Sequence, residues 1–426
     1  MNTKIRLTIL NFLEFAVWGA YLTSMGGYLA RVGLEASYIG YFYSIPGFVS
    51  IIMPALMGIV ADRWIQAQKV LSLCHFLAGS MMIAASLYCI QVADNVDFPT
   101  LFALYSVSVA FFMPTIALAN SVSYNALDKA GLDAVKAFPP IRVFGTVGFI
   151  VSMWIVDLSG WQTTSLQFLW SGILSIILAL YSLTMPKCAT NDSKTNSSIV
   201  QALGLEAFKL FKNYRMALFF IFSMLLGCCL QITNAYAGPF LQSFGINDAY
   251  QGTFGVEHSN ILISLSQMSE TLCILLIPFC LSRFGIKKVM LMSMVAWALR
   301  FGFFAIGNPG DGVWLLILSM IVYGIAFDFF NISGSLFVDK ETDISIRNSA
   351  QGVFMMMTNG FGASLGMIVA GWVVNMYTIN ENGLVIDKSG TGGWAEAWTI
   401  FAIYAFVIAV MFAVLFRYKH SPEKTR

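Results

Sequence analysis

Two stretches decide the fold: Gly58-Ile-Val-Ala-Asp-Arg-Trp64 and Ser282-Arg-Phe-Gly-Ile-Lys-Lys288. Each follows an apolar segment long enough to cross a membrane, and each places arginine directly before an aromatic residue, with lysine shortly after. The first lies between the second and third apolar segments, and the second lies between the eighth and ninth. These matching positions predict two halves of six segments each. Ordinary positively charged loops at the inner membrane face are the simpler alternative.

The composition places these segments in a membrane. Of the 426 residues, 58% are hydrophobic and 11% are charged, whereas soluble domains carry about 25% charged residues. A water-soluble protein of this length could not cover its surface with so few charges. A cytosolic enzyme, a disordered chain and a secreted disulfide-rich domain are therefore excluded, and the net charge of +2 gives no reason to expect nucleic-acid binding.

Twelve apolar segments have the length of a membrane-spanning helix, since about 20 residues cross the hydrocarbon core. The expected spans are 5–30, 38–61, 70–92, 99–121, 140–159, 165–185, 215–239, 259–281, 286–306, 313–336, 348–377 and 395–417. No segment alternates in polarity as a membrane β-strand does. We therefore predict an all-α membrane protein with 12 transmembrane helices in two six-helix halves around a central cavity.

The longest polar stretch separates these halves. Residues 1–185 form the expected N-terminal half, 186–214 a cytoplasmic central linker and 215–426 the C-terminal half. Within the linker, residues 204–212 are expected to form a short amphipathic helix on the membrane surface. With the N-terminus inside, 20 of the 24 Lys and Arg fall in cytoplasmic segments and two in outer loops. This asymmetry predicts that both termini are cytoplasmic.

Five ionisable side chains lie well within the expected spans: Glu14, Arg142, Glu270, Arg300 and Asp328. Each costs a few kcal/mol near the bilayer centre unless it faces a wet cavity or a partner, and transport sites are the usual reason to keep such residues. For Arg142, a position at the membrane interface is an equal alternative. For Asp328 the alternative is a structural salt bridge, and Arg300 is expected to make a structural pair.

Amide and carboxyl side chains recur three residues apart on two successive spans. Gln231 and Asn234 share a face of span seven, and Gln267 and Glu270 share a face of span eight. Such groups need partners across the helix, so they indicate a polar binding site, with helix packing as the alternative. The glycines of residues 360–366 are expected to allow close helix packing rather than to bind a nucleotide.

We expect neither a cofactor nor a metal. The seven cysteines show no C-x-x-C spacing, and the three histidines are too scattered for a metal site. No Walker A sequence is present, so ATP-driven transport by this chain alone is not expected.

Longer motifs resemble known families. Residues 58–63 resemble the G-x-x-x-D-R motif of the major facilitator superfamily, and residues 282–288 resemble its weaker C-terminal copy. The stretches 138–149, 230–234 and 323–334 resemble the bacterial nucleoside:proton symporter family, and this similarity runs nearly end to end. It implies uptake of purine and pyrimidine nucleosides across the inner membrane, driven by the proton gradient. We expect a multi-pass inner-membrane protein that works as a monomer.

The resemblance also implies a nucleoside site with residues from spans five, seven, eight and ten. These are Arg142, Thr146, Phe149, Gln231, Asn234, Gln267, Glu270, Tyr323 and Phe327. Amides and a carboxylate can bind ribose hydroxyls and base edges, and aromatic rings can stack on the base. Asp328, Glu270 and Glu14 are the candidates for proton coupling. The family tends to carry glutamine where this chain has Glu14, which adds a titratable acid here.

Other functions stay open at this point. A proton-coupled sugar or oligosaccharide permease of the same superfamily would use similar residue types, and a nucleoside uniporter would leave the buried acids structural. A membrane enzyme is disfavoured because no nucleophile–base pairing is evident. A nucleoside sensor is disfavoured because the short tails leave no room for a signalling domain.

Overall fold

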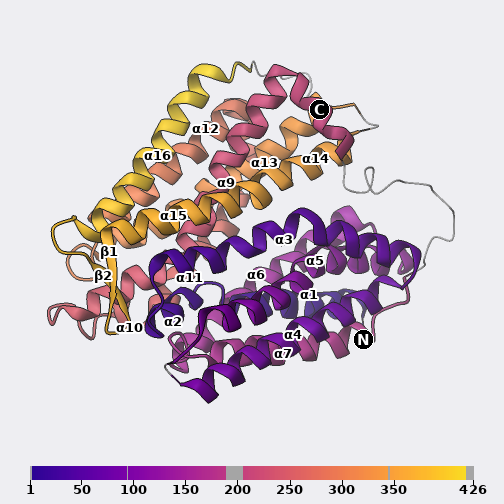
Figure 1. The fold of residues 1–426 in the computed structure, drawn as a ribbon. Helices are drawn as coiled ribbons and strands as arrows, with labels where there is room; N and C mark the ends of the chain where they lie inside the picture. The colour runs from indigo at the N-terminus through magenta and orange to yellow at the C-terminus, as the bar shows by residue number, and fades with distance from the viewer. Residues whose placement is uncertain (1, 94, 189–204, 344–345, 419–426) are drawn as a thin grey trace. The chain divides into compact units, whose positions relative to one another are not determined.

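The structure is a computed structural model that describes residues 2–93, 95–188, 205–343 and 346–418, most of them helical (Figure 1). The chain forms two compact units. The N-terminal unit comprises Met1–Leu34 and Phe48–Ser197, and the C-terminal unit comprises Glu35–Gly47 and Ser198–Arg426. The boundaries expected from the sequence, 1–185, 186–214 and 215–426, stay a prediction.

The N-terminal unit consists of seven helices, except that the first part of α3 belongs to the C-terminal unit. They are α1 (Thr3–Gly19), α2 (Met25–Arg31), α3 (Ala36–Arg63), α4 (Ala67–Val92), α5 (Phe98–Lys129), α6 (Ala134–Leu158) and α7 (Leu166–Ser182). Side-chain caps define two of the starts. Asn2 accepts a hydrogen bond from the Lys4 amide, and Asp97 accepts one from the Thr100 amide.

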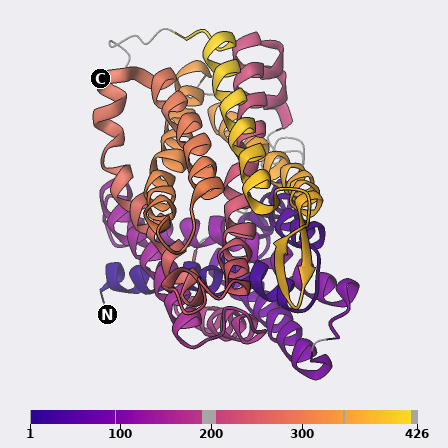
Figure 2. The same cartoon turned by 90° about the vertical axis from the view of Figure 1, so that its left-hand side faces the viewer.

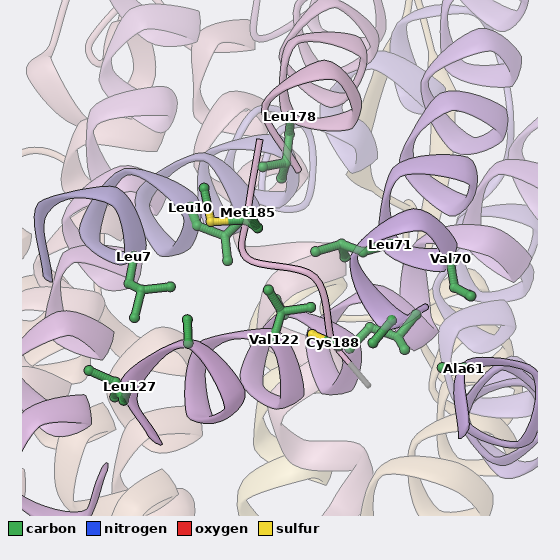
Figure 3. Close-up of a cluster of buried hydrophobic side chains, with 14 of the residues drawn as sticks. Leu7, Leu10, Ala61, Val70, Leu71, Val122, Leu127, Leu178, Met185 and Cys188 are labelled. Atoms are coloured by element: carbon green, nitrogen blue, oxygen red, sulfur yellow. The ribbon is translucent and has the colours of Figure 1, made fainter. Parts of the chain in front are cut away.

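Apolar side chains from these helices form the core of the N-terminal unit (Figure 3). Leu10 of α1, Leu71 of α4, Val122 of α5 and Leu178 of α7 are all fully buried there. Met185, in the segment after α7, packs into the same cluster. The cluster therefore holds together helices that are distant in the sequence.

The C-terminal unit contains the remaining elements. They are η1 (Leu205–Lys212), α9 (Tyr214–Ser243), η2 (Phe244–Ile246), α10 (Phe254–Glu257), α11 (Ser259–Ile274), α12 (Ile277–Ile306), α13 (Val313–Glu341), α14 (Arg347–Met355), η3 (Met356–Gly362), α15 (Ala363–Tyr377), β1 (Thr378–Glu381), β2 (Leu384–Asp387) and α16 (Gly393–Leu415). η1 is a 3-10 helix within the linker segment expected to be helical, and η3 is a π-helical turn between α14 and α15.

All twelve expected spans coincide with helix. Nine helices in the described part of the chain are long and apolar enough to cross a membrane, and α7 is a shorter apolar helix. The prediction of an all-helical membrane fold is confirmed by this architecture, whereas the full count of twelve spans stays a prediction.

The helix boundaries differ from the expected ones in three places. One lies inside span eight, 259–281, where α11 ends at Ile274 and α12 begins at Ile277. The first span, 5–30, is broken after Gly19, and a separate helix, α2, begins at Met25. The expected break between spans eight and nine becomes a kink inside α12, where Gly285 has a φ of 76°. A left-handed backbone at that point suits glycine, because it has no Cβ.

A short antiparallel hairpin between α15 and α16 was not expected from the sequence (Figure 2). Thr378 pairs with Asp387, and Glu381 pairs with Leu384. The Asp387 carboxylate accepts a hydrogen bond of 2.7 Å from the Trp394 amide, and the Trp394 indole donates to the Val385 carbonyl. These bonds tie the hairpin to the start of α16.

Candidate functional site

In the N-terminal unit, α6 carries three of the predicted site residues. Arg142, Thr146 and Phe149 lie at positions i, i+4 and i+7 of one continuous helix, so they share a face. The Arg142 guanidinium carbon lies 3.8 Å from the centre of the Phe15 ring on α1. This is a cation–π contact, which holds the half-buried arginine against α1.

Small residues bring α6 close to α1. A Cβ atom at Gly148 would lie 2.1 Å from the Phe12 carbonyl oxygen, and one at Gly19 would lie 2.3 Å from the Phe149 carbonyl oxygen. No side chain fits at either point without moving backbone. The glycines therefore set how near the Phe15 ring lies to Arg142.

In the C-terminal unit, α9 presents the predicted amide pair. The Asn234 amide nitrogen donates to the Gln231 side-chain oxygen at 3.3 Å. The shared face inferred from their spacing is thus confirmed. The bond satisfies only part of each amide, since an amide side chain offers two donor hydrogens and an acceptor oxygen with two lone pairs.

Polar groups of α11 and α13 lie near one another. The Gln267 side chain interacts with the Tyr323 phenol. Glu270 interacts electrostatically with both Tyr323 and Asp328. The two helices therefore bring two carboxyl groups, an amide and a phenol into one region of this unit.

Aromatic rings form the adjoining part of α13. Tyr323 and Phe327 have ring centroids 5.9 Å apart and planes inclined by only 6°, and Trp297 of α12 contacts Tyr323 edge-on at 6.0 Å. Phe327 and Asn331 line a cavity of about 20 Å³, which is room for about one water molecule. Flat aromatic faces of this kind suit the stacking of a planar ligand, although the cavity in this structure is too small to hold one.

Asp328 is 6% exposed, and its Oδ2 atom is buried without a hydrogen-bond partner among the described residues. Within the same residues it forms no salt bridge, so the structural salt bridge weighed from the sequence finds no support here. A buried carboxylate is costly unless it is paired or protonated. Asp328 therefore has the surroundings expected of a group that binds and releases a proton.

Arg300 of α12 is 1% exposed. One guanidinium nitrogen donates to the Ser319 carbonyl at 2.7 Å and to the Ser266 hydroxyl at 3.2 Å. The guanidinium carbon also lies 4.7 Å from the centre of the Tyr323 ring. The contacts seen here are thus hydrogen bonds and a cation–π interaction, and they hold Tyr323 in place.

Glu14 of α1 lies in a buried network that includes a residue the sequence reasoning passed over. Its Oε1 atom accepts from the Thr115 hydroxyl at 2.7 Å, and its Oε2 atom lies 2.8 Å from His75 Nε2. His75 is 0% exposed. The sequence was considered for metal-binding histidines only, and His75 was therefore not linked to Glu14. The signal that could have found it is that an acid within an apolar span needs a polar partner, and His75 is the histidine of span three.

The structure tests the expectation for the glycines of residues 360–366 but not the one for the G-x-x-x-D-R motif of residues 58–63. The glycines of residues 360–366 do pack helices: a Cβ at Gly362 would lie 2.2 Å from the Met224 carbonyl oxygen, and one at Gly366 would lie 2.0 Å from Cys228 Cβ. That expectation is confirmed. For residues 62 and 63 of the G-x-x-x-D-R motif, the side chains lie outside the described part of the structure.

Comparisons with known proteins show the family and the fold. Residues 1–421 match the family model described as nucleoside H+ symporter. The chain is 49% identical to the xanthosine permease of Escherichia coli K12 over 429 residues, which covers 100% of this chain and 99% of the relative. It is also 49% identical to the nucleoside permease NupG of that strain over 422 residues, which covers 99% of this chain and 97% of the relative.

Solved structures show the same fold. A crystal structure of the nucleoside transporter NupG matches with a TM-score of 0.88 at 48% identity, over 98% of this chain and 100% of that one. The helical membrane architecture and the end-to-end similarity therefore support the same assignment. The chain belongs to the nucleoside H+ symporter family and has the major facilitator fold.

Proposed function

We propose that this protein takes up nucleosides together with protons across the bacterial inner membrane by alternating access. The observation that carries the proposal is the family match along residues 1–421. The names of two relatives at 49% identity, xanthosine permease and nucleoside permease, supply the substrate class.

The residues proposed for nucleoside binding are those expected from the sequence. The N-terminal unit contributes Arg142, Thr146 and Phe149, and the C-terminal unit contributes Gln231, Asn234, Gln267, Glu270, Tyr323 and Phe327. The parallel rings of Tyr323 and Phe327 support a stacking role toward the base. The amide pair on α9 and the carboxylate of Glu270 have the donors and acceptors needed for ribose hydroxyls.

Proton coupling is assigned to carboxyl groups, with Asp328, Glu270 and Glu14 as the candidates. Proton binding moves a transport cycle only if it changes the energy difference between conformations or the affinity for the substrate. The electrostatic interaction of Asp328 with Glu270 supports such a link, because Glu270 also belongs to the proposed substrate site. A charge change on Asp328 is then felt where the nucleoside binds.

The proposal has further features that are expected from the sequence. The protein is a monomer in the inner membrane with both termini in the cytoplasm, and it releases its substrate chemically unchanged. It needs neither a cofactor nor a metal.

A competition assay tests the substrate class. Cells lacking their own nucleoside carriers and expressing this chain should take up labelled uridine, and unlabelled adenosine should block this uptake while mono- and disaccharides should not. Block by a sugar would instead place the protein among the sugar permeases. Recovery of a covalently altered nucleoside from washed membranes would show an enzyme.

A further inference from the structure

Four helices of the N-terminal unit meet at one buried polar network. Glu14 of α1 contacts Thr115 of α5 and His75 of α4, and His75 Nδ1 lies 3.0 Å from the hydroxyl of Ser175 on α7. The exposed fractions of these four side chains are 1% or less. Two titratable groups, an acid and an imidazole, are thus in direct contact out of reach of bulk water.

Counting hydrogens gives the number of protons for the arrangement in which the Ser175 hydroxyl donates to the His75 carbonyl. The Ser175 hydroxyl donates its single hydrogen to the His75 carbonyl at 2.9 Å. It can therefore only accept from His75 Nδ1, which must carry a hydrogen. A further hydrogen must lie between His75 Nε2 and Glu14 Oε2, because two lone pairs would otherwise face each other at 2.8 Å. The pair in this arrangement is protonated and has no net charge.

The same network can lose that proton without leaving a polar atom unpaired. If the Ser175 hydroxyl turns and donates to Nδ1, His75 can keep a hydrogen on Nε2 and donate it to an ionised Glu14. The His75 carbonyl keeps its helical acceptor position within α4. One proton has then left for water, and the net charge of the pair has changed from 0 to −1.

Several other titratable groups lie near Glu14 and His75, but among titratable groups the hydrogen bonds described above join only Glu14 and His75 to each other. The titratable groups around them are Cys74 on α4, which interacts electrostatically with Glu14, and Arg142 on α6, whose guanidinium stacks on Phe15, the residue after Glu14. Tyr21, in the turn after α1, and Tyr105 of α5 pack edge-on against each other. The sequence of α7 has its titratable residue at Tyr181, whose hydroxyl donates to the Arg6 carbonyl at the start of α1.

A small cavity next to Ser175 gives water a place beside the network. Its volume is about 10 Å³, and Tyr21, Ser108 and Ser171 line it together with Ser175. That volume is at the lower limit for a single water molecule, and several hydroxyl groups surround it. The cavity thus has room for at most one water molecule next to Ser175.

We propose that Glu14 and His75 form a proton-binding site of the N-terminal unit, with one proton shared between Glu14 Oε2 and His75 Nε2 and with the Ser175 hydroxyl as the group that reverses its hydrogen bond. Proton binding here does not depend on the proposed function. Only its use in coupling, as a second proton site besides Asp328, rests on nucleoside symport.

NMR of the full-length protein with ¹⁵N-labelled histidine tests the site directly, because the chain has only three histidines. Spectra are recorded from about pH 5 to about pH 9, the range in which histidine normally changes charge. The His75→Gln variant assigns the signal, and His258→Gln is the matched control for removing a histidine. We expect both nitrogens of His75 to be protonated at low pH and only Nε2 at high pH, and we expect Glu14→Gln to abolish this transition.

A His75 signal that keeps one protonation form across the range would overturn the proposal and leave the pair as a structural link. The coupling role is read separately in vesicles. There Glu14→Gln should weaken the pH dependence of driven uridine accumulation while Asp328 maintains a part of it, and an unchanged pH dependence would remove the site from coupling. Failure of wild-type vesicles to transport any nucleoside would reject the proposed function while leaving the histidine titration as it is.

Discussion

Buried ionisable side chains differ in how the fold satisfies them. Glu14 has a histidine and a hydroxyl as partners, and Arg300 has hydroxyl, carbonyl and aromatic partners. Asp328 instead has a buried carboxyl oxygen without a partner among the described residues. An unpaired buried carboxylate is tolerated when protonation can neutralise it. This difference makes Asp328 the first choice for the coupling proton.

Replacing Asp328 with asparagine should separate accumulation from exchange. Asparagine keeps the shape but cannot bind and release a proton, so accumulation driven by a pH gradient should be lost while exchange of labelled for unlabelled uridine continues. Uptake into proteoliposomes measures both. Asp339→Asn is the matched control on the same helix, because Asp339 forms an exposed pair with Arg347 and such pairs contribute roughly 0–1 kcal/mol. Full concentrative uptake in Asp328→Asn would remove Asp328 from the mechanism.

Replacing Arg300 with lysine should weaken nucleoside binding through Tyr323. Lysine keeps the charge but lacks the planar fork that reaches Ser266 and Ser319 while lying over the ring. A desolvated cation–π contact contributes about 2 kcal/mol, which sets an upper limit of roughly 30-fold on the loss of affinity. Uridine titration of the purified protein measures this change.

The control for that variant lies on the same helix. Arg283→Lys changes an exposed arginine of α12 and should leave uridine affinity unaltered. A folded Arg300→Lys protein with wild-type affinity would show that Arg300 serves α12 packing and not the position of Tyr323.

The sequence predicts which polar residues share a face of one helix better than it predicts their partners on other helices. Three-residue spacing suffices to place Gln231 and Asn234 on one face, because helix geometry is regular. It does not reveal that Glu14 meets His75, since that contact joins α1 to α4 and depends on how the helices pack. The stacking of Tyr323 on Phe327 is a matter of side-chain rotamers, which a sequence pattern does not specify.

At the scale of elements, glycines determine which helices lie close together. Gly148 brings α6 onto the backbone of α1, and Gly227 brings α9 onto η3, where a Cβ would lie 2.0 Å from the Thr358 carbonyl oxygen. The second contact is made by a π-helical turn, a feature often found at functional sites. In a membrane, where the lipid tails are as apolar as the side chains, such close packing is a main source of helix association.

Replacing Gly148 with alanine should destabilise the N-terminal unit. The added methyl group meets the Phe12 carbonyl, and overpacking of this kind costs about 1–3 kcal/mol. Gly302→Ala is the control, because a Cβ there meets nothing within 4 Å and alanine favours a helix by roughly 0.4–1 kcal/mol where it fits. Thermal unfolding in detergent should show a lower midpoint for the first variant only. Equal midpoints would mean that α1 and α6 are less tightly packed than described.

Hydropathy predicts the existence of the helices but not their interruptions. Every expected span contains helix because a long apolar run in lipid must satisfy its own backbone. The break after Gly19 and the hairpin at Thr378–Asp387 escape such a window, since neither changes the average hydropathy much. The kink at Gly285 depends on a single left-handed residue, which a window of about 20 residues does not resolve.

At the scale of the whole molecule, the chain consists of two helical units of the major facilitator fold. The distribution of lysine and arginine predicts that both ends lie in the cytoplasm. A fluorescent protein that matures only in the cytoplasm, fused to the C-terminus, should therefore fluoresce. Activity of a periplasmic phosphatase fused at the same point would contradict this orientation.

The central claim is that a proton gradient drives nucleoside accumulation by this chain. The most direct test is uptake of labelled uridine and adenosine into proteoliposomes, with and without an inward proton gradient. The account predicts concentrative uptake that collapses when a protonophore is added. Equal uptake with and without the gradient would contradict it and show a uniporter, and no uptake of either nucleoside would refute nucleoside transport itself.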